Sequence, residues 1–222
     1  MLREEAVLAA KNGYTEFPRN QWSAEAIEDA AYALAESARG DASEALKVSA
    51  SRLVRGNVAV AYALNGDNAP SRKLIEELGA EAPSDYLLQF HQLPAAKALF
   101  LLRQNKPAEA LALLEPVRKY ELGSPISVDA YLVLYVRGLA YLQMKDAAKA
   151  AAEFQKILDH PGINSVSCFL PLARLNLARA YALLNDNAKA RTAYQDFFAL
   201  WKDADPDIPV LSSAKAEYAK LH

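Results

Sequence analysis

The stretch Tyr141-Leu-Gln-Met-Lys-Asp-Ala-Ala-Lys-Ala150 recurs forty residues later as Tyr181-Ala-Leu-Leu-Asn-Asp-Asn-Ala-Lys-Ala190. Two looser copies come earlier in the chain. Residues 62–71 keep the aromatic residue and the aspartate, and residues 101–110 keep the spacing with Leu and Lys in their places. Self-similarity at a fixed period of this length is typical of a stacked array of one supersecondary unit. The sequence therefore predicts a repeat protein with a period of 39 or 40 residues.

Composition and charge exclude several classes of protein. A hydrophobic fraction of 52% with a charged fraction of 23% is typical of an ordered chain that can bury a core. The 25 basic residues are scattered among 27 acidic ones, so there is no electrostatic case for binding nucleic acid. The sequence contains no run of about 18 uncharged apolar residues, so no membrane span is predicted. The sequence is compatible with a location in the cytoplasm and with one on the extracytoplasmic side of a membrane-anchored parent protein.

Apolar residues recur at helical spacing almost throughout, so the predicted fold class is all-α. Tight turns such as Lys145-Asp146 and Asn185-Asp186 join two helices into a hairpin, with the aspartate placed to cap the second helix. The chain is predicted to be a single array over residues 1–222. Its predicted parts are degenerate N-terminal helices at 1–50, repeats at 51–90, 91–128, 129–167 and 168–204, and a C-terminal capping helix at 205–222.

Small residues recur around the aromatic position of each unit. One lies three residues before it and another nine residues after it, as with Gly138 and Ala150 around Tyr141. This pattern resembles the tetratricopeptide repeat, which implies an α-α superhelix, a solenoid of helical hairpins that binds proteins. The period is longer than the 34 residues of that family, and the first-helix Trp is absent. Longer helices or connections are therefore expected.

Longer phrases at 137–141, 153–162 and 193–207 resemble the C-terminal repeat regions of acidobacterial-type receptor serine/threonine protein kinases. That resemblance implies a bacterial signalling protein with a kinase domain upstream. The helical pattern at Leu2–Ala10 has no preceding cap, which also suggests a longer polypeptide. The chain itself has no glycine-rich phosphate loop, His-Arg-Asp loop or Asp-Phe-Gly motif, so it is not predicted to be an enzyme.

The tetratricopeptide resemblance implies a concave groove lined by the first helix of each hairpin. The groove is mostly apolar and suits an apolar or amphipathic segment of a protein or peptide partner. Its arginines could hold a carboxylate bidentately. The alternative is that several of these side chains bury against longer helices or neighbouring chains. The candidate partner-binding residues are Asn57, Arg103, Leu132, Tyr135, Leu139, Asn176 and Arg179.

Catalytic and metal-binding patterns are weak. His91, His160 and His222 are far apart and have no Cys or carboxylate at metal-ligand spacing, so no metal or cofactor is predicted. Cys168 begins an apolar helix and is interpreted as a small core residue. The leading hypothesis is a non-catalytic interaction scaffold, and the alternative is a self-association module that sets the oligomeric state. A hydrolase or transferase would need a converging nucleophile and base, which the sequence does not offer.

Overall fold

The computed structural model describes Leu46 and residues 51–123, 130–164, 167–202 and 209–221. Within these residues it contains nine α-helices and no strand, which confirms the all-α prediction. The chain divides into two compact units, Leu2–Gln104 and Asn105–His222. The predicted helices at 1–50 lie outside the described residues, apart from Leu46.

The first unit is built on the helical hairpin of α4 (Arg52–Asn65) and α5 (Asn68–Glu81). The Ser51 hydroxyl accepts a hydrogen bond of 3.3 Å from the Val54 amide and so caps the start of α4. A π-helical turn, η2 (Leu88–Gln92), leads directly into α6 (Leu93–Arg103). Both η2 and α6 pack against α4 and α5, so α4 lies at the centre of this unit.

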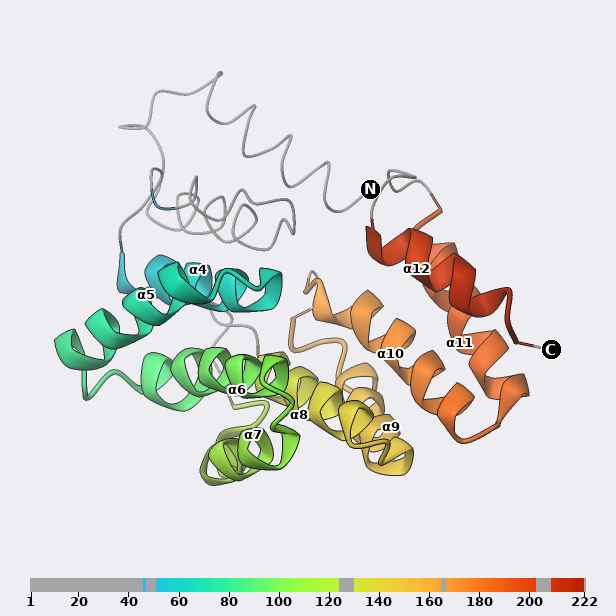
Figure 1. The fold of residues 1–222 in the computed structure, drawn as a ribbon, viewed down its shortest axis with the longest axis horizontal. Helices are drawn as coiled ribbons and strands as arrows, with labels where there is room; N and C mark the ends of the chain where they lie inside the picture. The colour runs from blue at the N-terminus through green and yellow to red at the C-terminus, as the bar shows by residue number, and fades with distance from the viewer. Residues whose placement is uncertain (1–45, 47–50, 124–129, 165–166, 203–208, 222) are drawn as a thin grey trace, which may run out of the picture. The chain divides into compact units, whose positions relative to one another are not determined.

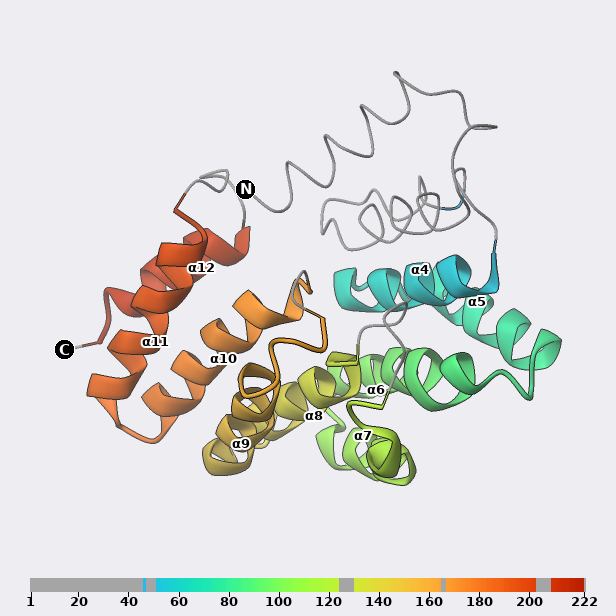
Figure 2. The same ribbon diagram turned by 180° about the vertical axis from the view of Figure 1, so that it is seen from behind.

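The second unit contains two stacked hairpins. Helix α8 (Leu132–Gln143) pairs with α9 (Ala147–Leu158), and α10 (Phe169–Leu183) pairs with α11 (Asn187–Leu200), as Figures 1 and 2 show. Helix α10 contacts both α8 and α9, which joins the two hairpins. Helix α7 (Pro107–Leu114) and the 3-10 helix η3 (Glu115–Tyr120) precede them, and α12 (Pro209–Tyr218) follows and packs against α11.

The hairpin turns repeat one backbone geometry, and this geometry explains the recurring sequence. Gly66, Asn105, Lys145 and Asn185 each have a left-handed backbone, with φ of 94°, 58°, 59° and 59°. In the two copies of the quoted stretch, an aspartate follows the left-handed residue. The Asp146 amide donates to the Tyr141 carbonyl at 2.9 Å, and the Asp186 amide donates to the Tyr181 carbonyl at 3.0 Å. The left-handed residue closes the first helix and the aspartate begins the second.

The aspartates cap the second helices as predicted. Asp146 accepts from the Lys149 amide at 3.3 Å, and Asp186 accepts from the Lys189 amide at 3.2 Å. The lysine of each pair also lies over the tyrosine ring of the preceding helix, 5.6 Å from the Tyr141 centroid in the first copy. Tyrosine, aspartate and lysine therefore form one local cluster per turn, with a structural role.

Small residues let the paired helices approach closely. A methyl group built on Gly138 would lie 2.5 Å from the Phe154 ring atoms Cε1 and Cζ. In the first unit, the Ser71 hydroxyl donates 2.5 Å to the Ala59 carbonyl, which ties α5 to α4 at the equivalent position. The small positions of the sequence pattern are therefore the helix contacts within each hairpin.

Candidate partner-binding face

Helices α8 and α10, the first helices of the two hairpins in the second unit, carry five of the predicted partner-binding residues. Three of these residues are buried: Leu132, Tyr135 and Asn176 are 3%, 7% and 1% exposed. The other two, Leu139 and Arg179, are half-buried and reach the solvent. Only part of each predicted helix face is therefore accessible to solvent.

Further accessible side chains share these helix faces. Leu142 and Gln143 follow Leu139 by three and four residues, the spacing that places side chains on one side of a helix. Leu183 is 48% exposed and follows Arg179 by four residues. We call the accessible side chains on this side of α8 and α10 the first-helix face; it consists of Leu139, Leu142, Gln143, Leu172, Arg179, Ala182 and Leu183. It is apolar apart from one amide and one guanidinium group.

A chain of hydrogen bonds runs along α10 and connects three of the predicted residues. The Asn176 side-chain amide donates 3.1 Å to the Tyr135 hydroxyl, and Arg179 donates 3.0 Å to the Asn176 carbonyl oxygen. Arg179 also donates through Nε and Nη2 to the two carboxylate oxygens of Glu217 on α12, at 2.8 and 2.9 Å. Arg179 therefore binds a carboxylate bidentately, and that carboxylate belongs to the same chain.

Burial and hydrogen bonding shift the pKa values in this network. Burial raises the pKa of Glu217, but the hydrogen bonds from Arg179 and Tyr194 outweigh it and hold the pKa below its ordinary value. Burial, together with a hydrogen bond to the Glu217 carboxylate, raises the pKa of Tyr194. Burial also raises the pKa of Tyr135 to about 12. At neutral pH, Glu217 is therefore ionised and both tyrosines are neutral; the Tyr194 hydroxyl donates to Glu217, and the Tyr135 hydroxyl accepts from Asn176.

A second ionic cluster lies inside the second unit, centred on Arg137 of α8, which is 2% exposed. Its Nε and Nη2 atoms donate to Glu153 of α9 at 3.1 and 2.5 Å, and Nη1 donates to Glu121. Lys156 also pairs with Glu121. Burial raises the pKa of Glu121, but hydrogen bonds from Arg137 and Lys156 bring it below its ordinary value. This cluster ties α8, α9 and the residues after η3 together.

In the first unit, Asn57 and Arg103 make hydrogen bonds within the unit. Asn57 of α4 is buried, and its side-chain oxygen accepts from the Gln92 amide. Arg103 is exposed but donates to two carbonyls at the end of α4, those of Ala63 at 3.1 Å and Leu64. A cation at this place complements the C-terminal end of the helix dipole. These contacts give both residues a structural role, and any partner contact by them stays a prediction.

His91 of the π-helical turn is a buried imidazole, and the residue is 2% exposed. Neither ring nitrogen has a hydrogen-bond partner among the residues that the structure describes. Burial lowers the pKa of His91 from its ordinary value of 6.5, so the ring is neutral at pH 7. The Tyr86 ring lies edge-on to it, with the centroids 5.4 Å apart. The surroundings are those of a core side chain.

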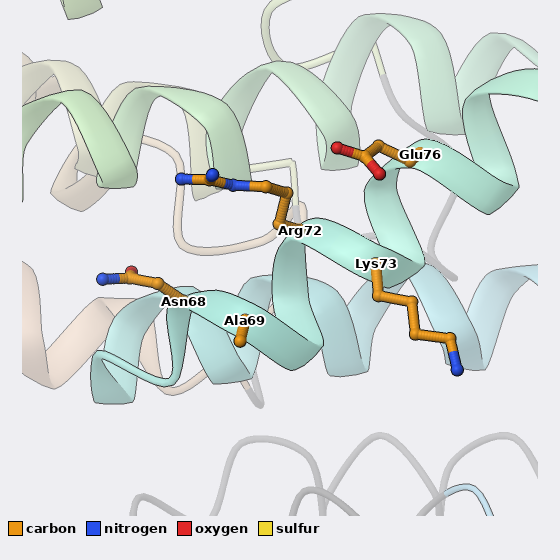
Figure 3. Close-up of a pocket in the computed structure, with 5 residues that line it drawn as sticks. All are labelled: Asn68, Ala69, Arg72, Lys73 and Glu76. Atoms are coloured by element: carbon orange, nitrogen blue, oxygen red, sulfur yellow. The ribbon is translucent and has the colours of Figure 1, made fainter.

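No constellation of converging catalytic groups is found among the described residues. The hollow drawn in Figure 3 is lined by one face of α5, and its Arg72 and Lys73 side chains point away from each other. No group of three or more His, Cys, Asp or Glu side chains could hold a metal ion in the described part of the chain. In the same residues, no helix is long and apolar enough to cross a membrane.

The carboxylate partners of Arg137 and Arg179 were not predicted from the sequence. The bond between Arg179 and Glu217 joins residues 38 positions apart and has no signal in local spacing. Glu153 could have been found, because Gly138 contacts Phe154 across the hairpin. The residues next to these two, Arg137 and Glu153, must then lie near each other on facing helices.

Residues 132–161 and 172–203 each match the family model described as Tetratricopeptide repeat. The first matched segment contains the α8–α9 hairpin, and the second covers the α10–α11 hairpin from Leu172 onward. This part of the chain is therefore a tetratricopeptide-repeat region, a class that generally mediates protein–protein interaction and is typically non-catalytic. No match is found among curated proteins or among solved structures.

Proposed function

We propose that this chain is a non-catalytic scaffold that binds a segment of a protein partner on the first-helix face of α8 and α10. The observation that carries the proposal is the accessible apolar surface of Leu139, Leu172 and Leu183 within two matched tetratricopeptide repeats. Apolar side chains exposed together on one side of stacked helices favour an amphipathic segment of a partner. Affinity comes from the apolar area, and the exposed Gln143 side chain at the end of α8 sets the register.

The experiment is to select binders from a displayed library of helical peptides and measure their affinities for variants of the full chain. Leu139→Asp and Leu172→Asp place a charge on the face and are expected to weaken binding at least tenfold. Ala152→Asp, on the exposed side of α9, is the control and should leave the affinity unchanged. Binders whose affinity is the same for all three variants would overturn the face assignment.

A second candidate function is self-association, and it is favoured by the way α12 is attached. Helix α12 contributes Leu211 and Ala214 to a buried cluster with Phe197 and other side chains of α10 and α11. The terminal helix is therefore held by side chains of the preceding hairpin. Light scattering over a concentration series tests this candidate, since a strict monomer at all concentrations contradicts it.

The signalling context is a further proposal that rests on the sequence resemblance alone. The resemblance to repeat regions of acidobacterial-type receptor kinases supports a parent protein with a kinase domain, in which the repeats bind a partner or bring kinase domains together. The sequence of the full-length polypeptide tests it. An upstream kinase domain is expected, and an unrelated domain there would contradict the proposal.

A further inference from the structure

Helix α12 sits on a surface of the α10–α11 hairpin that is complementary to it in both shape and charge. We call this surface the α12-binding face; it consists of Leu175, Ala178, Arg179, Ala193, Tyr194 and Phe197. The C-terminal side chains that meet it follow at intervals of three and four residues, namely Leu211, Ala214 and Tyr218 of α12 and Leu221 just after its end. That spacing forms one apolar stripe along a helix. The face therefore recognises an amphipathic helix.

A polar site fixes the register of this helix. Three hydrogen bonds reach the Glu217 carboxylate, two from Arg179 at 2.8 and 2.9 Å and one from the Tyr194 hydroxyl at 2.8 Å. Side-chain bonds at the far end of the helix add to this. Arg191 donates to the Leu221 carbonyl, and Gln195 donates 3.1 Å to the Tyr218 hydroxyl. A helix that lacked the glutamate would leave Arg179 without its carboxylate, so the site selects by charge as well as by shape.

The bound helix is short and depends on the face for its structure. Helix α12 has 10 residues, and isolated helices of this length are marginal in water. Its stability comes from the contacts with α10 and α11. Those contacts are made by side chains that are the same in every copy of the chain. The face of one copy therefore presents the same apolar cluster and the same arginine to the α12 of another copy.

We propose that the α12-binding face is a helix-binding site that accepts α12 from a second copy of the chain, so that two copies associate by exchanging their terminal helices. This inference deepens the self-association candidate and rests on it. The helix from the second copy carries the same apolar stripe of Leu211, Ala214 and Tyr218, with Glu217 beside the tyrosine. The intramolecular helix competes with it, because a tethered ligand acts at an effective concentration in the millimolar range.

The first test uses a fluorescent peptide of residues 209–221 and the full chain. Leu211→Asp in the full chain places a carboxylate in the apolar cluster and releases the intramolecular helix. We expect this variant to bind the peptide at least tenfold more tightly than the wild type does. Ala216→Asp, on the exposed side of α12, is the matched control and should bind as the wild type does. Equal binding by Leu211→Asp and the control overturns the proposal.

A charge exchange makes the test specific for the Arg179 and Glu217 pair. A full chain with Arg179→Glu repels its own Glu217, and a chain with Glu217→Arg repels its own Arg179. We expect each variant alone to be monomeric and an equimolar mixture to form a one-to-one complex with twice the 24.3 kDa mass of the chain. A mixture that remains monomeric, with both variants helical by circular dichroism, overturns the exchange.

A peptide-binding measurement tests the proposal even if either of these two variants folds poorly. The Glu217→Arg peptide should bind the Arg179→Glu, Leu211→Asp chain, and the unchanged peptide should bind the Leu211→Asp chain. The proposal is supported if the Arg179→Glu, Leu211→Asp chain prefers the Glu217→Arg peptide and the Leu211→Asp chain prefers the unchanged peptide. It is contradicted if both chains prefer the same peptide. If the helix exchange is not observed, peptide binding at Leu139 and Leu172 is still expected. The failure of this inference is therefore distinguishable from that of the partner-binding proposal.

Discussion

Replacing Arg137 by methionine should destabilise the second unit strongly, because it removes the buried cation that donates to both Glu121 and Glu153 at the centre of the cluster. The Arg137 and Glu121 side chains are 2% and 5% exposed, and that of Glu153 is 11% exposed. Breaking a buried ion pair by removing one partner costs about 3–5 kcal/mol. Lys156 still pairs with Glu121 in the variant, so we expect a loss of about 3 kcal/mol, near the lower limit of that range.

The measurement is urea unfolding followed by the fluorescence of Trp201, in a chain in which Trp22 is replaced by Phe. Trp201 packs against the cluster that contains Phe197 and therefore reports on the second unit. The stability difference should shrink as the pH falls from 7 to 5, because the buried carboxylates that lose Arg137 take up protons more readily in the folded variant than in the folded wild type.

Two variants separate the effect of charge from that of packing. Arg118 is 46% exposed and also contacts Glu153, so Arg118→Met should cost less than about 1 kcal/mol. Arg137→Met combined with Glu121→Gln and Glu153→Gln removes the buried charges that lose Arg137 and should recover most of the lost stability. An Arg137→Met variant no less stable than Arg118→Met would refute the reasoning that this buried cluster holds α8 and α9 together.

Three further predictions concern packing and protonation. Gly138→Ala should cost about 1–3 kcal/mol in urea unfolding, because its methyl group overlaps the Phe154 ring; Gly162→Ala has open space around it and should be within about 0.5 kcal/mol of the wild type. His91→Leu should raise stability by about 1 kcal/mol, and the wild type should lose stability relative to it below pH 6.5, where only the unfolded imidazole gains a proton. The pKa of Glu217 lies below its ordinary value of 4.5 in the folded chain, so α12 should be released as the pH falls below 4.5 and through this lowered pKa. The release should change the fluorescence of Trp201, and Glu217→Gln should abolish that change.

The hairpins were predictable because their signals are local. The turn residues Lys145 and Asn185, the capping aspartates beside them and the small residue Gly138 each act within one hairpin, so spacing along the chain was enough to place them. The helix boundaries follow from the same turns. The matched segments at 132–161 and 172–203 lie on the two hairpins with the clearest repeats.

The candidate site was less predictable because burial depends on contacts between hairpins. Tyr135 and Asn176 lie on the expected helix faces, but they meet each other across α8 and α10 at 3.1 Å and are removed from solvent. The role of Glu217 depends on where α12 docks, which no repeat spacing encodes. The prediction of one array over residues 1–222, with its repeat boundaries, remains a prediction.

The same helix positions serve different roles along the chain. The position that follows the small residue is Leu139 in α8 and Arg179 in α10. Leu139 is available to an external segment, whereas Arg179 holds the carboxylate of α12. A partner that uses Arg179 would therefore compete with the terminal helix, whereas one that contacts only Leu139 and Leu142 would not.

Site-resolved photo-crosslinking with a peptide selected on the wild-type chain tests the central claim most directly. A photoreactive residue is placed in turn at Leu139, Leu172, Ala152 and Ala188, the last two being exposed positions on the second helices α9 and α11. We expect the peptide to crosslink at Leu139 and Leu172 and to leave Ala152 and Ala188 unlabelled. Crosslinking at Ala152 or Ala188 with none at Leu139 and Leu172 would contradict the proposal that the first-helix face binds the partner.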